Sequence, residues 1–245
     1  MDKLVNELIS YLKIKEKIIG ILVYGSYVIE ELDEFSDIDI LVVLDDRYID
    51  ECGRGRYCFE KCGIEIEYFI ETEGNIYKSL LQELDTLEPI NRNRFLMGKI
   101  LIDKDGRLEK IKNRAKQTQL MPYTPLSKNE IIINSIFYKN KIKNLKRKFK
   151  NNELDKEMYY YDYISNLIRF YYRINCKPII FEKMYKTLIS NEYRKINLQC
   201  DIEDKYVKEM FVTLIKEINI ENLEKLVDYI LKDWIPNEKN YRIYY

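Results

Sequence analysis

Two short apolar segments decide the fold of this chain. Residues 18–26 read IIGILVYGS, and residues 37–44 read DIDILVVL. Both segments are rich in β-branched residues and bounded by turn or polar residues, as buried strands are. The first ends at the turn Gly25-Ser26, after which we expect a short helical piece over about residues 27–32. The sequence therefore predicts two neighbouring strands that each carry polar residues at one end.

Acidic side chains recur at these strand ends. Asp37 and Asp39 are two residues apart, so strand alternation directs both carboxylates to the same side. A third strand, predicted over residues 63–70, places Glu65 and Glu67 together on one of its faces by the same rule. The three predicted strands thus place acidic side chains and the Gly25-Ser26 turn near one edge of a sheet.

The rest of the chain separates into two halves. Apolar spacing behind Asp2 predicts an opening helix over residues 4–12, and further elements are expected as helices over 76–84 and 91–97 and a strand over 99–103. Beyond residue 107 the strand signal fades. After a proline-bearing segment, Ser127 and Glu130 form a capping box that starts a series of helices. These helices are expected over residues 128–150, 155–174, 181–189, 203–218 and 221–233.

We therefore predict an α/β (α+β) domain with a small mixed sheet over residues 1–120, followed by an all-α helical bundle over residues 127–245.

The composition of the chain excludes several partners and catalytic mechanisms. The chain has 245 residues, 41 basic and 41 acidic side chains and no histidine. Balanced charge gives no general attraction for a polyanion, so we do not expect a nucleic acid partner. The absence of histidine excludes Ser-His and Cys-His catalysis and leaves proton transfer to carboxylates, lysine, tyrosine or cysteine.

The cysteines and the apolar runs indicate the compartment. Five cysteines without regular spacing favour reduced thiols over a disulfide framework. Three of them, Cys52, Cys58 and Cys62, cluster, but without a Cys-x-x-Cys pair they make a weak case for zinc. No apolar run approaches the roughly 20 residues that span a bilayer. We expect a cytoplasmic protein without a membrane partner, either a monomer or a homodimer.

The turn and the acidic pair together suggest phosphate and metal chemistry. Glycine lets the backbone approach a ligand closely, and a helix start supplies free N–H donors, to which Ser26 adds a hydroxyl. Two aligned carboxylates such as Asp37 and Asp39 form the kind of oxygen site that magnesium shares with substrate phosphates. Each signal is weak alone, but their order on consecutive strands is specific.

In this order, the residues resemble the DNA polymerase beta-like nucleotidyltransferase superfamily. Its signature is Gly-Ser, about ten residues, Asp-x-Asp, and a third acid on a neighbouring strand. Here these elements are Gly25-Ser26, Asp37-Ile38-Asp39, and Glu65 or Glu67. Within the superfamily the chain looks most like the antibiotic nucleotidyltransferases of the kanamycin, streptomycin and lincosamide types, which join a catalytic domain to a helical bundle.

The resemblance implies a role for each matching residue. Gly25 and Ser26 would bind the β- and γ-phosphates, and Asp37 and Asp39 would hold two magnesium ions. The third carboxylate would be Glu65, because the strand is similar to the Gly-x-Glu-Val strand of the lincosamide enzymes, with Glu67 as the alternative. The family often continues Gly-Ser with a basic residue that this chain lacks. A cation from the bundle would then be needed at the phosphates, and the candidates are Lys139, Lys143, Arg169 and Lys177.

The resemblance also implies a reaction. We expect transfer of a nucleoside monophosphate, AMP first, from ATP or another nucleoside triphosphate to a hydroxyl of an aminoglycoside or lincosamide, with release of pyrophosphate. One alternative keeps the chemistry but uses a protein or RNA partner as acceptor, as antitoxin-type relatives do. Another is a degenerate module that binds nucleotide without turning it over.

Overall fold

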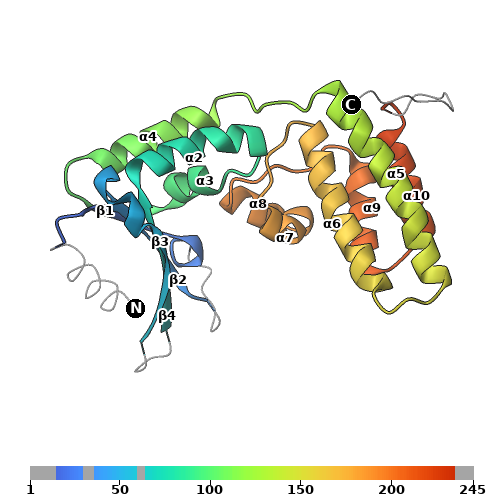
Figure 1. The fold of residues 1–245 in the computed structure, drawn as a ribbon, viewed down its shortest axis with the longest axis horizontal. Coiled ribbons are helices and arrows are strands. Elements are labelled where there is room, and N and C mark those ends of the chain that lie inside the picture. The colour runs from blue at the N-terminus through green and yellow to red at the C-terminus, as the bar shows by residue number, and fades with distance from the viewer. Residues whose placement is uncertain (1–14, 30–35, 60–63, 235–245) are drawn as a thin grey trace. The chain divides into compact units, whose positions relative to one another are not determined.

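The computed structural model describes residues 15–29, 36–59 and 64–234. The chain divides into two compact units, the first made of Met1–Tyr123 with Ile196–Leu198 and the second of Thr124–Lys195 with Gln199–Tyr245. Each unit has its own hydrophobic core. Figure 1 shows the elements of both units.

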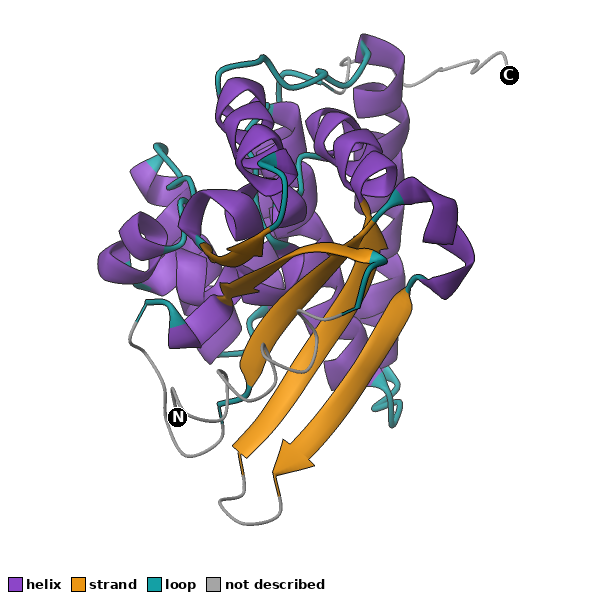
Figure 2. Ribbon diagram, turned by 90° about the vertical axis from the view of Figure 1, so that its left-hand side faces the viewer, coloured by secondary structure: helices purple, strands orange, loops and turns teal. Residues whose placement is uncertain are grey.

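The first unit is built on one five-stranded mixed sheet. Its strands are β1 (Ile18–Tyr24), β2 (Ile38–Leu44), β3 (Gly53–Phe59), β4 (Ile64–Thr72) and β5 (Lys99–Asp103), in the order β3-β4-β2-β1-β5. Strands β2 and β4 run parallel, and the other neighbouring pairs are antiparallel. Figure 2 shows these strands as a single layer. All seven residues of β1 are buried because the strand is covered on both faces.

Three helices cover one face of this sheet, as Figure 1 shows: α2 (Glu73–Thr86), α3 (Ile90–Met97) and α4 (Arg107–Gln119). Side chains from all three, such as Leu80, Phe95 and Ile111, pack with Leu22 and Leu41 of the central strands. Two 3-10 helices join strands in this unit, η1 (Gly25–Tyr27) after β1 and η2 (Asp46–Glu51) after β2. The covered face therefore has an apolar centre, and polar residues are left at the strand ends.

The second unit is helical. It contains α5 (Lys128–Lys150), α6 (Lys156–Ile174), η3 (Phe181–Lys183), α7 (Met184–Ile189), α8 (Asn191–Ile196), α9 (Lys205–Lys216) and α10 (Ile220–Leu231). Helix α5 begins with the capping box, in which Ser127 Oγ accepts from Glu130 N at 3.2 Å and Ser127 N donates to Glu130 Oε2 at 2.7 Å. The tyrosines of α6 are core residues. Tyr160 and Tyr163 are fully buried, and their hydroxyls donate to backbone carbonyls, so this stripe serves packing and not base stacking.

This architecture confirms the predicted fold class, a small mixed sheet with helices followed by an all-α region. Strand β3 and helices α4 and α8 were not predicted. The sequence of β3 has no clear apolar alternation and α8 is short, whereas α4 carries Leu108, Ile111 and Ala115 at a helical spacing that the prediction did not use. The predicted opening helix and half of the piece at 27–32 lie outside the described residues. In the part of the chain that the structure describes, no helix is long and apolar enough to cross a membrane.

Candidate active site

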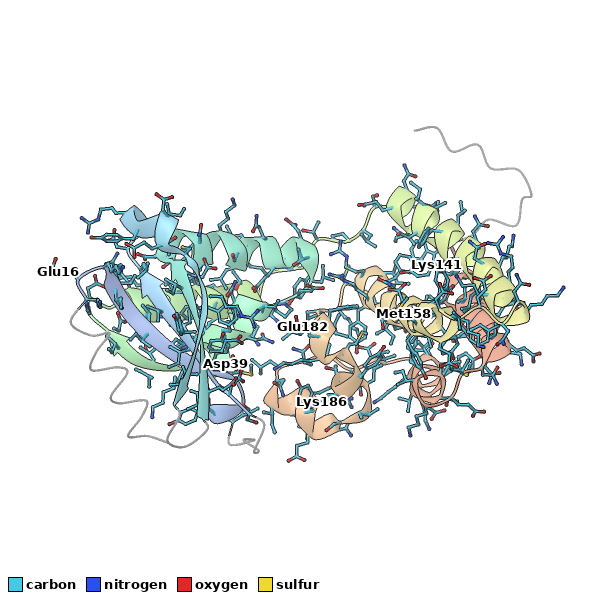
Figure 3. All side chains as sticks on the ribbon, turned by 60° about the horizontal axis from the view of Figure 1, so that its bottom comes forward. Glu16, Asp39, Lys141, Met158, Glu182 and Lys186 are labelled. Atoms are coloured by element: carbon cyan, nitrogen blue, oxygen red, sulfur yellow. The ribbon has the colours of Figure 1, made fainter. Side chains whose placement is uncertain are left out.

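The register of three strands aligns an acidic row on the helix-covered face. Tyr24 of β1 pairs with Asp39 of β2, and Asp39 pairs in turn with Glu67 of β4. Asp37 directly precedes β2 and lies two residues from Asp39, so alternation carries it to the same face. Figure 3 labels Asp39 on the sheet.

Three carboxylates meet in this row. One oxygen each of Asp37, Asp39 and Glu67 lies within 4.8 Å of the other two. Among residues 15–29, 36–59 and 64–234, this is the one group of three carboxylates or thiols found this close together. Oxygen ligands with this spacing suit a hard divalent cation such as magnesium. The donor set therefore fits the metal that the sequence suggested.

The third acid of this group is Glu67. Glu67 is only 7% exposed, whereas Glu65, the residue favoured from the sequence, is exposed. The physical reason is the parallel register: Ile38 pairs with Ile66, which sets Asp39 opposite Glu67. Glu65 lies one pleat further along, about 7 Å away along the strand. The structure thus brings together Asp37, Asp39 and Glu67 and leaves Glu65 outside the group.

Gly25 makes room for this group. Its φ is +75°, a conformation that favours glycine, and a Cβ built on it would lie 2.2 Å from Oδ2 of Asp39. The Asp39 carboxylate therefore packs directly against the turn that the sequence assigned to phosphate. Ser26, next to it, is half-buried.

Arg94 contacts two aromatic rings next to the acidic row. The guanidinium carbon of Arg94, on α3, lies 4.8 Å from the ring centroids of both Tyr24 and Phe69. The Tyr24 hydroxyl is buried without a hydrogen-bond partner among the described residues. Burial raises the pKa of this hydroxyl well above its usual range, and nearby Arg94 opposes that effect. Tyr24 therefore stays protonated beside the carboxylates.

Arg54 is a site residue that the sequence reasoning missed. It lies on β3, its Nε donates to Oε1 of Glu67 at 2.8 Å, and its Nη2 donates to the same oxygen. Its guanidinium also lies 5.0 Å from the centroid of Phe69. The only signal in the sequence was alternation in residues 53–56, which read GRGR and gave no apolar face.

The four predicted phosphate cations belong to the second unit, and three of them have local partners there. Lys139 pairs with Asp228 at 2.5 Å, and Lys177 pairs with Glu203 at 2.6 Å. Arg169 lies 4.9 Å from the ring centroid of Phe181, and Lys143 is exposed. Their role at the phosphates stays a prediction.

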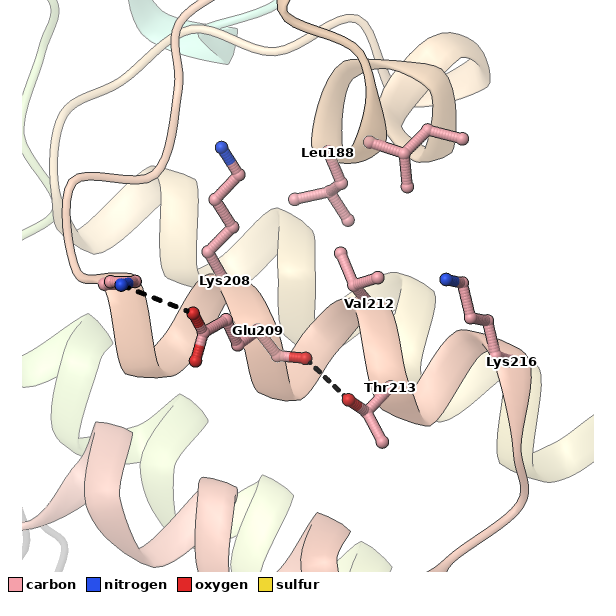
Figure 4. A pocket seen from close by; sticks show the side chains of 8 residues that line it. Leu188, Lys208, Glu209, Val212, Thr213 and Lys216 are labelled. Carbon is pink, nitrogen blue, oxygen red and sulfur yellow. Dashed lines mark hydrogen bonds and ion pairs between the residues drawn. The ribbon is translucent and has the colours of Figure 1, made fainter.

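A groove of about 640 Å³ in the second unit has a different character (Figure 4). Its lining residues come from α7 and α9 and their flanks: Leu188, Ile189, Lys205, Lys208, Glu209, Val212, Thr213 and Lys216. Three lysines and one carboxylate cannot form a site for a divalent cation. The candidate active site is therefore the carboxylate group on the sheet and not this groove.

Comparison with family models supports the same assignment. A family model described as polymerase beta, nucleotidyltransferase matches residues 6–107, which include Gly25, both aspartates and Glu67. The chain is also similar to the crystal structure of a nucleotidyltransferase-like protein from Exiguobacterium sibiricum, at 14% identity and a TM-score of 0.43, over 96% of this chain and 74% of that one. No curated protein matches. The match over residues 6–107 therefore indicates a nucleotidyltransferase domain of the polymerase beta type in this part of the chain.

Proposed function

We propose that this nucleotidyltransferase moves a nucleoside monophosphate, AMP in the first instance, from a nucleoside triphosphate to a hydroxyl of a small molecule such as an aminoglycoside or lincosamide. The reaction would depend on magnesium and release pyrophosphate. In this proposal residues 1–120 act as the catalytic domain and residues 127–245 as its helical partner domain. The observation that carries it is the set of three carboxylates within 4.8 Å of one another, of which Asp39 packs against Gly25.

Each residue has a defined task in the proposed reaction. Asp37 and Asp39 would hold magnesium, which when bound supplies positive charge to the phosphate oxygens. The N–H groups and hydroxyl of the Gly25-Ser26 turn would bind the β- and γ-phosphates. Glu67 would orient the acceptor hydroxyl and take its proton. The acceptor oxygen then forms a bond to the α-phosphorus as the bond between that phosphorus and the bridging oxygen breaks, and pyrophosphate leaves with the electron pair.

A screen for pyrophosphate release tests this proposal. Each of the four nucleoside triphosphates is incubated with magnesium and a panel of aminoglycosides and lincosamides, with the parent chain and Asp37→Asn side by side. We expect one combination to turn over, and the variant to lose about 1,000-fold or more in rate because it lacks a metal ligand. Circular dichroism should show that the variant keeps its fold and melting temperature.

Two outcomes would contradict the proposal in different ways. If Asp37→Asn worked as fast as the parent, the metal assignment would be wrong. If no small molecule accepted a nucleotide, incubation of the chain with labelled ATP and cell lysate would show whether a macromolecule becomes labelled. Label on a protein or RNA would replace the small-molecule acceptor, and no label at all would indicate a nucleotide-binding module.

A further inference from the structure

The two side chains of the ion pair between Arg54 and Glu67 differ in their exposure to solvent. Glu67 is nearly buried, with a side chain 9% exposed, whereas the Arg54 side chain is 60% exposed. A buried carboxylate cannot rely on water to offset its charge, so a partner that bonds it directly matters. Arg54 provides this by donating from both Nε and Nη2 to the Oε1 oxygen.

The neighbouring carboxylates increase the need of Glu67 for a positively charged partner. Three negative charges within 4.8 Å repel one another, so positive charge near Glu67 stabilises the arrangement. Two guanidiniums lie over the same ring, that of Phe69: Arg54 at 5.0 Å and Arg94 at 4.8 Å. Both are therefore close to the acidic row, because Phe69 is two residues from Glu67 on β4.

The side chains of these two arginines differ in exposure and in their contacts. Arg94 is held between two rings, Tyr24 and Phe69, and its Nη1 donates to Asn91 Oδ1 at 3.1 Å. The Arg54 side chain is mostly exposed, so its guanidinium has solvent beside it. Of the two arginines, Arg54 is the more exposed and the one bonded to Glu67.

A divalent cation bound by the group would face Arg54 across the same carboxylate. Two positive charges a few ångströms apart repel strongly near a protein surface. We propose that Arg54 is a positioning residue which competes with the divalent cation for Glu67: the ion pair orients the carboxylate, and cation binding displaces the guanidinium. This inference rests on the proposed function for the cation at Asp37 and Asp39, and it adds an interaction of that cation with Glu67.

Manganese binding tests the competition without any need for turnover. Free manganese is followed by electron paramagnetic resonance as it is titrated with the full chain, for the parent and for Arg54→Met, Arg54→Lys and Arg47→Met. Removal of the guanidinium should tighten manganese binding about tenfold, since a repelling charge is lost. Lysine keeps the charge, so Arg54→Lys should bind within about threefold of the parent.

Arg47→Met is the matched control. Arg47 is also an exposed arginine of the first unit, its Nε donates to Asp45 Oδ1 at 2.8 Å, and it lies 5.8 Å from the ring of Tyr48. It follows the opposite end of β2, about 20 Å from the carboxylate group. Its variant should bind manganese like the parent.

The outcomes separate this inference from the proposed function. A purely structural Arg54 would leave Glu67 misplaced when removed, so binding by Arg54→Met that is equal to or weaker than the parent's overturns the inference alone. Asp39→Asn serves as the reference for the site. If the parent bound manganese no better than Asp39→Asn and Arg54→Met did not improve on it, both the metal assignment and the competition would be wrong.

Discussion

The two ends of strand β2 each collect three carboxylates, but they place an arginine differently. At the end that begins with Asp39, the acids face one another within 4.8 Å, and Arg54 bonds Glu67 from the side. At the other end, the acids surround Arg107. Its Nη1 lies 3.1 Å from Asp45 and 3.2 Å from Glu73, and its Nε lies 2.8 Å from Asp105.

Arg107, at the centre of the second group of acids, prevents these acids from acting as cation ligands. Hydrogen bonds, from Arg47 first and then from Arg107, lower the pKa of Asp45 to about 2, and the acids raise the pKa of Arg107. Each carboxylate there is satisfied by a guanidinium, and the three oxygens do not form a ligand group among the described residues. The number of acids therefore does not make a cation site. The site requires carboxylates that face one another.

The largest expected effect comes from removing one acid at each end. Asp39→Asn should reduce nucleotidyl transfer about 1,000-fold or more without lowering the melting temperature, because it removes a proposed metal ligand and relieves repulsion. Asp45→Asn should keep the rate and lower the melting temperature by about 2–4 °C, since it breaks pairs that hold the unit together. Steady-state rates and thermal melts of both variants measure this. Equal effects on rate would remove the distinction between the two ends.

Two glycines allow a second test of the same comparison. Gly25 and Gly106 both have positive φ, +75° and +79°, and lie at opposite ends of the sheet. Nothing lies within 4 Å of a Cβ added to Gly106, whereas one added to Gly25 meets the Asp39 carboxylate. Both alanine variants should lose about 1 kcal/mol of stability to backbone strain. Only Gly25→Ala should also lose activity, by about 100-fold, because Asp39 must move.

Rates normalised to the folded fraction of each variant separate these two effects. A Gly25→Ala variant that kept full activity would show that the position of Asp39 is not critical. The same loss in both variants would mean that strain alone, and not the contact with Asp39, limits the reaction.

Local patterns explain why much of the fold could be predicted. The runs at 18–24 and 37–44 are buried strands, and Ser127 and Glu130 cap a helix, because apolar content and capping chemistry act within a few residues. Strand β3 was missed because its sequence, GRGRYCF, has no apolar face and its place depends on pairing with β4. A strand that is stabilised mainly by pairing with a neighbouring strand has no clear pattern in its own sequence.

The same limit applies to the candidate site. Alternation is local, so the sequence could indicate that Asp37 and Asp39 share a face. The choice between Glu65 and Glu67 depends on the register of β2 against β4, which pairs residues 28 positions apart, such as Asp39 and Glu67. The role of Arg54 could not be predicted for a related reason. Arg54 bonds Glu67 from strand β3, and that strand was not predicted.

Glu83 shows a third environment for a carboxylate, neither paired with arginine nor grouped with other acids. It is 8% exposed, and it accepts hydrogen bonds from the backbone N–H groups of Asn91 at 2.5 Å and Arg92 at 3.0 Å, at the start of α3. Burial raises its pKa from 4.5 to about 7, because the two hydrogen bonds only partly offset the loss of water. This cap positions the helix that carries Arg94.

The smallest expected effect follows from this raised pKa. The folded state binds the Glu83 proton more tightly than the unfolded state, so the contribution of Glu83 to the free energy of unfolding is full below about pH 4.5 and is lost as the pH rises through about 7. The loss is about 3 kcal/mol for a shift of this size. Glu83→Gln cannot ionise and keeps an acceptor for the N–H groups, so its stability relative to the parent should rise between pH 5 and pH 8. Urea unfolding of both proteins across this range measures the difference. A constant difference would mean that Glu83 has an ordinary pKa and that its hydrogen bonds to α3 outweigh its burial.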